Sequence, residues 1–401
     1  MRRRSAVKAA LAATIATAAA FAAPAHAQEV IRIGAVAPKT GPLAGGAAVT
    51  HWPNFELWSK QVNERGGLKM KDGTRRKVEI IEYDDRTNPA EAIKAVQRLA
   101  TQDKADFIIA PYATGLNLAT APIFAQYGYP QIAVSAITDK TKELTERYPS
   151  IFFTLGNTTA FAQSVADVLT KMRSAGHIGN RVAMVNVADA FGIELAEAAR
   201  PIFKKAGFDI VFDRSYPLGT QDLSPIVKGA KAANPDAFVA WSYPPDTFAI
   251  TEQAQIESFN VKAFYTAVGT PFPGYGQKFG KAIEGVLGAG GVNVESPEIK
   301  QYFADHLKVT GKHADYWASP VTYASLQVLE QAIEGVGGTD RKAVTDYIKK
   351  NAFKTVMGEW RFNNQVIERF WTVGQWRNGQ FVGVASTGMP GEKDPVPKTG
   401  W

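Results

Sequence analysis

Cysteine is absent from this chain of 401 residues, and its absence excludes several kinds of chemistry. Without a thiol, the protein forms no disulfide, no thiolate metal site and no covalent intermediate on cysteine. A lipid anchor on an N-terminal cysteine is excluded for the same reason. A chain of this length buries an adequate core without disulfides, so an exported form does not need them.

Short catalytic and nucleotide-binding motifs are also missing. The sequence contains neither a GxxxxGK[ST] phosphate loop nor a GxSxG nucleophile elbow. Gly274-Tyr275-Gly276 with Gly280 lacks the glycine spacing and the preceding βαβ unit of a dinucleotide loop. No histidines have the HExxH spacing of a zinc site. We therefore expect no cofactor, no metal and no enzymatic activity, with a periplasmic enzyme as the minor alternative.

The first 27 residues predict a secretory signal peptide. Basic residues at Arg2 to Arg4 and at Lys8 precede an Ala-rich apolar run from Ala9 to Ala23. Ala25-His26-Ala27 then supplies the small-x-small pattern of a signal peptidase site. The run is shorter than the ~20 residues of a membrane-spanning helix, which is the alternative. We expect cleavage after Ala27 and a periplasmic location.

The charge balance argues against a nucleic-acid partner. The chain has 45 Lys+Arg and 38 Asp+Glu, a net charge of +7. Four of the basic residues belong to the predicted signal peptide, so the remainder has 41 basic and 38 acidic residues, a net charge of +3. This excess is too small to indicate nucleic-acid binding.

Strand and helix patterns alternate along the rest of the chain with short loops between them, which predicts βαβ units and parallel sheets covered on both faces. Two segments echo each other: residues 106–110 and residues 236–240 each precede a tyrosine, Tyr112 and Tyr243, within three positions. The sequence therefore predicts an α/β fold of two doubly wound parallel-sheet lobes.

Ligands of such sheets bind at the carboxyl ends of the strands, near helix N-termini. Four loops qualify, and in facing lobes they would converge on a cleft. They are residues 38–46, 111–117, 135–138 and 241–247.

Several blocks of sequence resemble the periplasmic branched-chain amino acid (Leu/Ile/Val)-binding proteins of ABC transporters. In chain order they are Gly41-Pro42-Leu43-Ala44, Asn63 to Gly67, Tyr83-Asp84-Asp85 with Asn88-Pro89-Ala90, Ala110-Pro111-Tyr112-Ala113-Thr114-Gly115, and Thr355-Val356-Met357-Gly358. Each block alone is a weak signal, but they follow the family's order from about Ile31 to Phe381.

The resemblance implies a type I periplasmic-binding fold, with three crossings between the lobes and a ligand cleft between them. Lobe 1 would comprise residues 28–153 and 290–356, and lobe 2 residues 154–289 and 357–401. It also implies a solute-binding protein that captures an amino acid or a related small carboxylate by lobe closure. Its partners would be the permease subunits of an ABC importer. A ligand sensor that uses the same closure is the alternative.

The resemblance also implies a set of ligand contacts. Thr114 matches a small hydroxyl residue that holds the ligand carboxylate together with neighbouring N–H groups. Ala136 and Thr138 match residues of the next loop that contact the carboxylate and the ammonium. Phe191 and Tyr243 match aromatic residues of the second lobe. The alternatives are that both threonines are only helix N-caps and that both rings are ordinary packing.

Two departures from the family leave the ligand open. Gly45-Gly46-Ala47-Ala48 stands where an aromatic residue often follows the Gly-Pro turn. Residues 267–272 contain no carboxylate, although amino-acid binders carry an acid there that pairs with the ligand ammonium. Either another acid, Asp189 or Asp246, replaces it, or the ligand is an aromatic carboxylate without an amino group. Aromatic residues near the expected cleft suit the second option.

Overall fold

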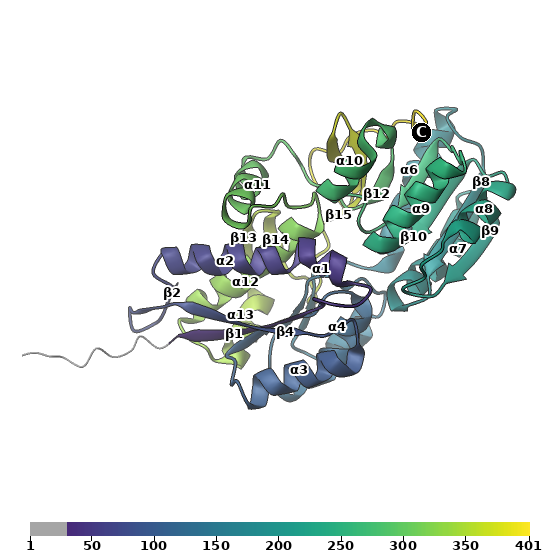
Figure 1. Ribbon diagram of the computed structural model, residues 1–401. Coiled ribbons are helices and arrows are strands. Elements are labelled where there is room, and N and C mark those ends of the chain that lie inside the picture. Colours follow the sequence, from purple (N-terminus) through teal and green to yellow (C-terminus); the bar gives the residue numbers. More distant parts are fainter. Residues whose placement is uncertain (1–29) are drawn as a thin grey trace, which may run out of the picture.

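The computed structural model describes residues 30–401, and the predicted signal peptide lies outside the described residues. Two lobes lie side by side (Figure 1). The elements from β1 to β7 share one lobe with the green helices α11 to α13, and those from α6 to β12 form the other with the C-terminal hairpin. Within residues 30–401, no helix combines the length and apolar character needed to cross a membrane.

Lobe 1 is built on short parallel strands. Its main sheet has the order β4-β1-β5, and β6 pairs with β7 beside it. The strands are β1 (Ile31–Ala37), β4 (Val78–Asp84), β5 (Phe107–Ile109), β6 (Gln131–Ala133) and β7 (Ile151–Phe153). The covering helices include α2 (Trp52–Glu64), α3 (Pro89–Thr101), α4 (Thr114–Gln126) and α12 (Ala318–Val336).

The alternation of side chains along β1 explains why this strand is buried on both faces. Ile31 and Ile33 belong to the cluster that contains Phe55 of α2, whereas Val36 belongs to the cluster of α3. At Gly34, a Cβ atom would stand 2.7 Å from Leu99 of α3, so glycine permits the close approach of helix and strand.

Lobe 2 contains one seven-stranded sheet of order β16-β15-β12-β11-β10-β8-β9. The first five strands in sequence are parallel, and β15 and β16 add an antiparallel edge. The strands are β8 (Arg181–Val187), β9 (Asp209–Tyr216), β10 (Ala237–Trp241), β11 (Ala263–Thr266), β12 (Leu287–Ala289), β15 (Trp371–Arg377) and β16 (Gln380–Ser386).

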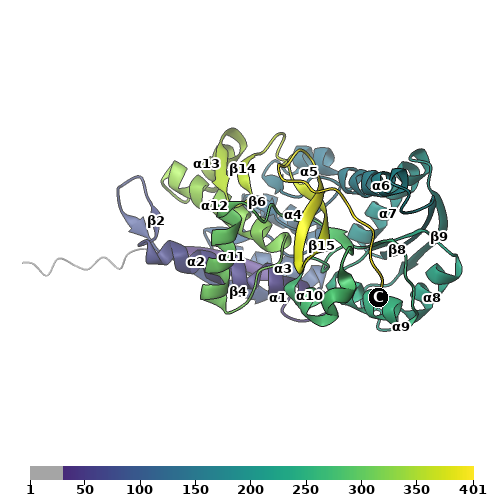
Figure 2. The ribbon, with the colours of Figure 1, turned by 90° about the horizontal axis from the view of Figure 1, so that it is seen from above.

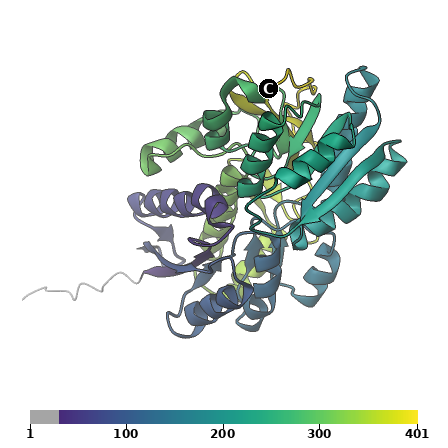
Figure 3. The ribbon, with the colours of Figure 1, turned by 45° about the vertical axis from the view of Figure 1, so that its right-hand side comes forward.

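Helices cover both faces of the lobe 2 sheet, as Figure 2 shows from above and Figure 3 from the side. One face carries α6 and α7 and the other α8 and α9. These helices are α6 (Thr158–Ser174), α7 (Ala190–Lys205), α8 (Ser224–Ala232) and α9 (Pro244–Ile256). The prediction of two doubly wound α/β lobes is therefore confirmed, with the antiparallel edge as an addition.

The other elements are mostly short, and several of them have no clear sequence signal. The helices are α1 (Ala44–Thr50), α5 (Thr141–Arg147), α10 (Pro273–Phe279), the 3-10 turn η1 (Gly280–Ile283), α11 (Pro297–Thr310) and α13 (Arg341–Lys350). The strands are β2 (Leu68–Lys69), β3 (Arg75–Arg76), β13 (Ala352–Thr355) and β14 (Gly358–Arg361).

The chain passes between the lobes three times, after β7, after β12 and after β14. The lobe limit predicted between residues 356 and 357 falls in the turn of the β13–β14 hairpin, whose strands are paired with each other. Beyond it, the N–H of Ile367 still donates to the carbonyl of Phe153 on β7 at 2.9 Å. We propose that the third crossing lies after Ile367.

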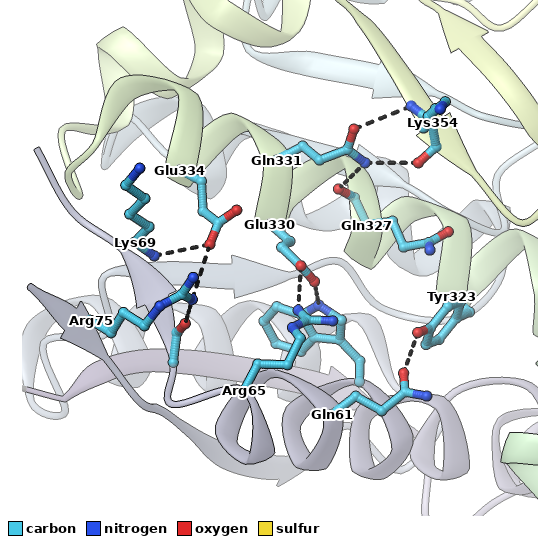
Figure 4. A network of polar contacts seen from close by, with 12 residues as sticks. Gln61, Arg65, Lys69, Arg75, Tyr323, Gln327, Glu330, Gln331, Glu334 and Lys354 are labelled. Atoms are coloured by element: carbon cyan, nitrogen blue, oxygen red, sulfur yellow. Dashed lines mark hydrogen bonds and ion pairs between the residues drawn. The ribbon is translucent and has the colours of Figure 1, made fainter. Parts of the chain in front are cut away.

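A polar network fastens α12 to the rest of lobe 1 (Figure 4). Glu330 accepts a hydrogen bond from Trp58 Nε1 at 2.9 Å and forms an ion pair with Arg65, both on or next to α2. Glu334 accepts from the backbone N–H of Lys69 at 2.9 Å, and Gln327 accepts from Val356 N at 2.8 Å. Helix α12, which follows the second crossing, therefore connects α2, β2 and the β13–β14 hairpin.

The N-terminus of α12 is held by a fully buried carboxylate. Asp315 accepts hydrogen bonds from the backbone N–H groups of Trp317, Ala318 and Ser319 at 2.7–2.8 Å. Burial raises the pKa of Asp315, and these donors offset that effect. The hydroxyl of Ser319 also donates to the carbonyl of Val49 at the end of α1, at 3.1 Å. Asp315 thus caps α12, and Ser319 joins α12 to α1.

We predict that Asp315→Ala destabilises the protein by about 3 kcal/mol or more, because three buried N–H groups lose their acceptor. Asp340→Ala is the matched control, since Asp340 caps α13 from an exposed position and its loss should cost about 1 kcal/mol. Urea unfolding of both variants measures the difference. Equal losses would contradict the anchoring role of Asp315.

Candidate functional site

The loops at the carboxyl ends of the strands meet where lobe 1 faces lobe 2. Helix α4 contacts α7 and helix α1 contacts α9 across this boundary. The predicted site residues all lie in these elements or in the loops beside them, and all are buried. Thr114, Ala136 and Thr138 come from lobe 1, and Phe191 and Tyr243 from lobe 2. Their roles as ligand contacts remain a prediction.

Thr114 is the first residue of α4, and its hydroxyl ties two loops together. Its Oγ1 accepts from the backbone N–H of Ile137 at 3.1 Å, and Ser135 Oγ accepts from the N–H of Ala113 at 2.9 Å. The N-cap position is Ala113, which has a φ of +73° and no side chain that can accept a hydrogen bond. The first turn of α4 therefore keeps N–H groups without a side-chain acceptor, which suits an anion.

Thr138 makes a contact across the lobe boundary. Its hydroxyl donates to Glu194 Oε1 of α7 at 2.9 Å, and the N–H of Asp139 donates to the same oxygen at 2.8 Å. The alternative that Thr138 is a helix N-cap, which places it directly before a helix, is wrong, because α5 begins only at Thr141 and has Lys140 as its N-cap. Thr138 is therefore engaged in joining the lobes, and the N-cap alternative does not apply to it.

A cluster of aromatic side chains lines the boundary between the lobes. The rings of Phe191 and Tyr243 lie 4.9 Å apart in lobe 2, and the ring of Tyr112 in lobe 1 lies 6.3 Å from that of Tyr243. His51 meets Tyr112 edge-on at 5.2 Å, and burial lowers the pKa of His51 to about 3, so its ring is neutral. The paired tyrosines after strands β5 and β10 are the one sequence signal that points to Tyr112, and no sequence pattern points to His51.

The small residues that follow the Gly-Pro turn make room for Tyr112. A Cβ atom at Gly46 would stand 2.5 Å from the Tyr112 hydroxyl oxygen, whereas a Cβ atom at Gly45 would meet nothing within 4 Å. Tyr112 thus places its ring against the segment where an aromatic residue was expected from the resemblance. This packing accounts for glycine at position 46.

Two carboxylates of lobe 2 flank Tyr243. Asp189, the N-cap of α7, accepts from Gly192 N and from the Tyr243 hydroxyl, both at 3.0 Å. Asp246, in the first turn of α9, accepts from the N–H of Tyr243 at 3.2 Å. Burial raises the pKa of Asp189, and it raises the pKa of Asp246 to about 6. Asp189 and Asp246 are the two acids that the sequence suggests as replacements for the carboxylate absent from residues 267–272.

The loop after β11, where the resemblance implies an acid, is held by contacts within lobe 2. Thr270 Oγ1 is hydrogen-bonded to Thr266, and the carbonyl of Thr270 accepts from Trp376 Nε1 at 2.8 Å. This loop therefore packs within lobe 2, and its side chains include no acid.

Comparison with known proteins gives consistent matches. A family model described as periplasmic binding protein matches residues 30–380. The chain is 26% identical to Leu/Ile/Val-binding protein homolog 7 of Brucella abortus, with 93% of this chain and 95% of that protein covered. It is also 26% identical to the Leu/Ile/Val-binding protein of Escherichia coli, with 82% and 86% covered.

Solved structures show the same fold at low identity. The substrate-binding protein of a branched-chain amino acid transporter from Streptococcus pneumoniae, in complex with isoleucine, has a TM-score of 0.76 at 20% identity, with 89% of this chain and 99% of that chain covered. A solute-binding protein of an ABC transporter from Rhodopseudomonas palustris, in complex with benzoate, has a TM-score of 0.77 at 17% identity, with 92% and 99% covered.

We predict that Gly45→Ala stabilises the protein by up to about 1 kcal/mol, because alanine favours the helix that glycine weakens. Gly46→Ala should give less stability than Gly45→Ala, since its new methyl group displaces the buried Tyr112. Chemical unfolding compares the two variants of α1 directly. An equal gain at both positions would show that Tyr112 moves away without cost.

The pKa of Asp246 predicts how stability changes with pH. The folded protein holds this proton with a pKa of about 6, against an ordinary value of 3.8. Between these values the folded state binds more protons than the unfolded state, so this residue's contribution to stability falls as the pH rises through that window. Asp246→Asn keeps an acceptor for Tyr243 N–H and should remove that contribution.

The expected result is that Asp246→Asn has a melting temperature above that of the parent at pH 7.5 but not at pH 4. Asp340→Asn, at the exposed cap of α13, is the control and should be neutral at both values. A stability difference that does not depend on pH would contradict the assignment.

Proposed function

The chain belongs to the periplasmic binding protein family, and from that premise we propose that it is the substrate-binding component of an ABC importer. In this proposal the two lobes close on an amino acid or a related small carboxylate. The closed protein then delivers the ligand to the permease subunits in the membrane. The protein is exported to the periplasm, its signal peptide is cleaved after Ala27, and it performs no catalysis.

The observation that carries this proposal is the pairing of two unlike surfaces at the lobe boundary. The lobe 1 surface offers the N–H groups at the start of α4 and the hydroxyl of Thr114, next to the fully buried Ala136. The lobe 2 surface offers the ring pair of Phe191 and Tyr243. A small carboxylate with an apolar body matches these two surfaces, with its acid on lobe 1 and its body against the rings.

A second candidate ligand is an aromatic carboxylate without an amino group. The close packing of Tyr112, Phe191 and Tyr243 favours a flat ring by offset or edge-on contacts. The benzoate complex of a neighbour with the same fold is consistent with this candidate. Both candidates place the carboxylate on lobe 1, so they make the same prediction for Thr114.

We predict that Thr114→Val weakens binding of amino acids or aromatic carboxylates by about tenfold or more, because a buried hydroxyl beside the acid is lost. Thr120→Val is the matched control, since Thr120 is equally buried in the same helix and its hydroxyl bonds to the helix backbone. Isothermal titration of the exported protein against leucine, phenylalanine and benzoate measures the affinities.

Native mass spectrometry of the protein purified from the periplasm should show a bound carboxylate of low mass. Binding of none of the three compounds, together with no retained small molecule, would contradict the proposed function. Equal affinities for the Thr114 and Thr120 variants would instead remove Thr114 from the site while leaving the capture role intact.

A further inference from the structure

A pocket of about 900 Å³ lies between α10 of lobe 2 and α11 of lobe 1 (Figure 1). We call it the flank pocket. The turn η1 and the β15–β16 turn complete its lobe 2 wall, and the segment just before α12 completes its lobe 1 wall. None of the residues predicted to contact the cleft ligand lines it. Its volume is typical of a site for one small organic molecule.

Three aromatic side chains form an apolar wall of the flank pocket. Phe303 of α11 meets Tyr316 edge-on at 5.4 Å, and Tyr316 meets Trp376 of β15 edge-on at 5.9 Å. Phe303 and Tyr316 are only half-buried, so part of their surface stays uncovered. A Cβ atom at Gly276 would stand 2.8 Å from Trp376, so glycine lets α10 approach the indole closely. Rings in this arrangement suit a flat apolar body.

Two donors of the flank pocket are free of partners. Lys281 of η1 forms no ion pair within residues 30–401. The hydroxyl of Tyr316 makes no hydrogen bond in the same part of the chain, and burial raises the pKa of Tyr316, so this hydroxyl keeps its proton.

The one acid of the lining is already engaged. Glu284 accepts a hydrogen bond from the N–H of Asn378 at 2.9 Å, and the positive charge of Arg377 lies near it. The charge that remains uncompensated in the lining is therefore the ammonium of Lys281. This balance favours an anionic group on the occupant over a cationic one.

From these observations we propose that the flank pocket is a second binding site, for a small organic anion with an aromatic body. The body lies against Phe303, Tyr316 and Trp376, and the acid group lies at Lys281. The inference goes beyond the proposed function, because it concerns a molecule other than the one captured in the cleft.

An occupant of the flank pocket would contact both lobes. Phe303 and Tyr316 belong to lobe 1, whereas Trp376 and Lys281 belong to lobe 2. Under the proposed function the angle between the lobes changes when the cleft closes, so the affinity of the flank pocket would change with it. By linkage, the occupant would in turn change the affinity of the cleft for its ligand.

A matched pair of fluorescent probes tests the inference. The anion 8-anilinonaphthalene-1-sulfonate is compared with N-phenyl-1-naphthylamine, which has the same aromatic body and lacks the sulfonate. Titration of the exported full-length protein with each probe gives the two affinities. We expect both probes to bind, because both carry the aromatic body.

The variant Lys281→Gln should weaken the sulfonate probe by about threefold or more and leave the uncharged probe unchanged, because only the sulfonate meets the ammonium. This loss should shrink at high ionic strength. Lys278→Gln is the matched control, since Lys278 is close in sequence but pairs with Glu252 at 2.7 Å and does not line the flank pocket. It should preserve both affinities.

The variant Phe303→Ala should weaken both probes by about threefold or more, because it removes part of the wall that holds the shared body. Phe212→Ala is its control, since Phe212 is a partly buried ring of β9 outside the flank pocket. Melting temperatures of all four variants show that each one is folded.

The other outcomes overturn the inference. They are equal effects of Lys281→Gln on the two probes, no effect of Phe303→Ala on either, and binding of neither probe. If leucine, phenylalanine or benzoate displaces the sulfonate probe while both pocket variants bind it normally, the probe occupies the cleft. The second site is then rejected, while the proposed capture of a carboxylate gains support.

Discussion

The packing of Tyr112 against Tyr243 joins the two lobes at the boundary between them. Each ring is also held by contacts within its own lobe. Tyr112 lies over Gly46 and against His51, while Tyr243 is held at its N–H by Asp246, at its hydroxyl by Asp189 and on its ring by Phe191. Because both rings are held within their lobes, the geometry of the lobe boundary follows from the fold of each lobe.

This arrangement has an energetic cost at the boundary between the lobes. The hydroxyls of Tyr112 and Tyr216 are buried there without a hydrogen-bond partner, and burial raises the pKa of Asp246 to about 6. A purely apolar boundary would hold the lobes shut without a ligand, since burial of apolar surface contributes ~25 cal/mol per Å². The unpaired polar groups reduce that tendency, so closure depends on what lies between the lobes.

The alternation of short apolar strands with helices made most of the fold predictable from sequence. Strands such as β1 and β10 are short, apolar runs, and Asn88-Pro89 marks the start of α3 by a cap that the structure contains. The short helix α1 was not predictable, because its Gly45-Gly46 pair opposes helix formation and is kept for Tyr112, a contact between residues 66 positions apart. The loops that meet at the lobe boundary were predictable, because parallel strands place their carboxyl ends together, and the predicted site residues lie in or next to those loops. The partners of those residues were not, because the contact of Thr138 with Glu194 exists only when two separate lobes meet.

Under the proposed function, that contact also affects how fast the ligand is released. Glu194, which is partly exposed to water, accepts from the buried hydroxyl of Thr138 and from the N–H of the exposed Asp139. A bond that forms only after the lobes have met does not change how often a ligand encounters the open cleft, but it does lengthen the lifetime of the closed state. Under the proposed function, the residence time of the ligand is thereby set partly by Glu194, a residue that is not among the predicted ligand contacts. The release rate and the chemical selectivity of such a protein then rest partly on different residues.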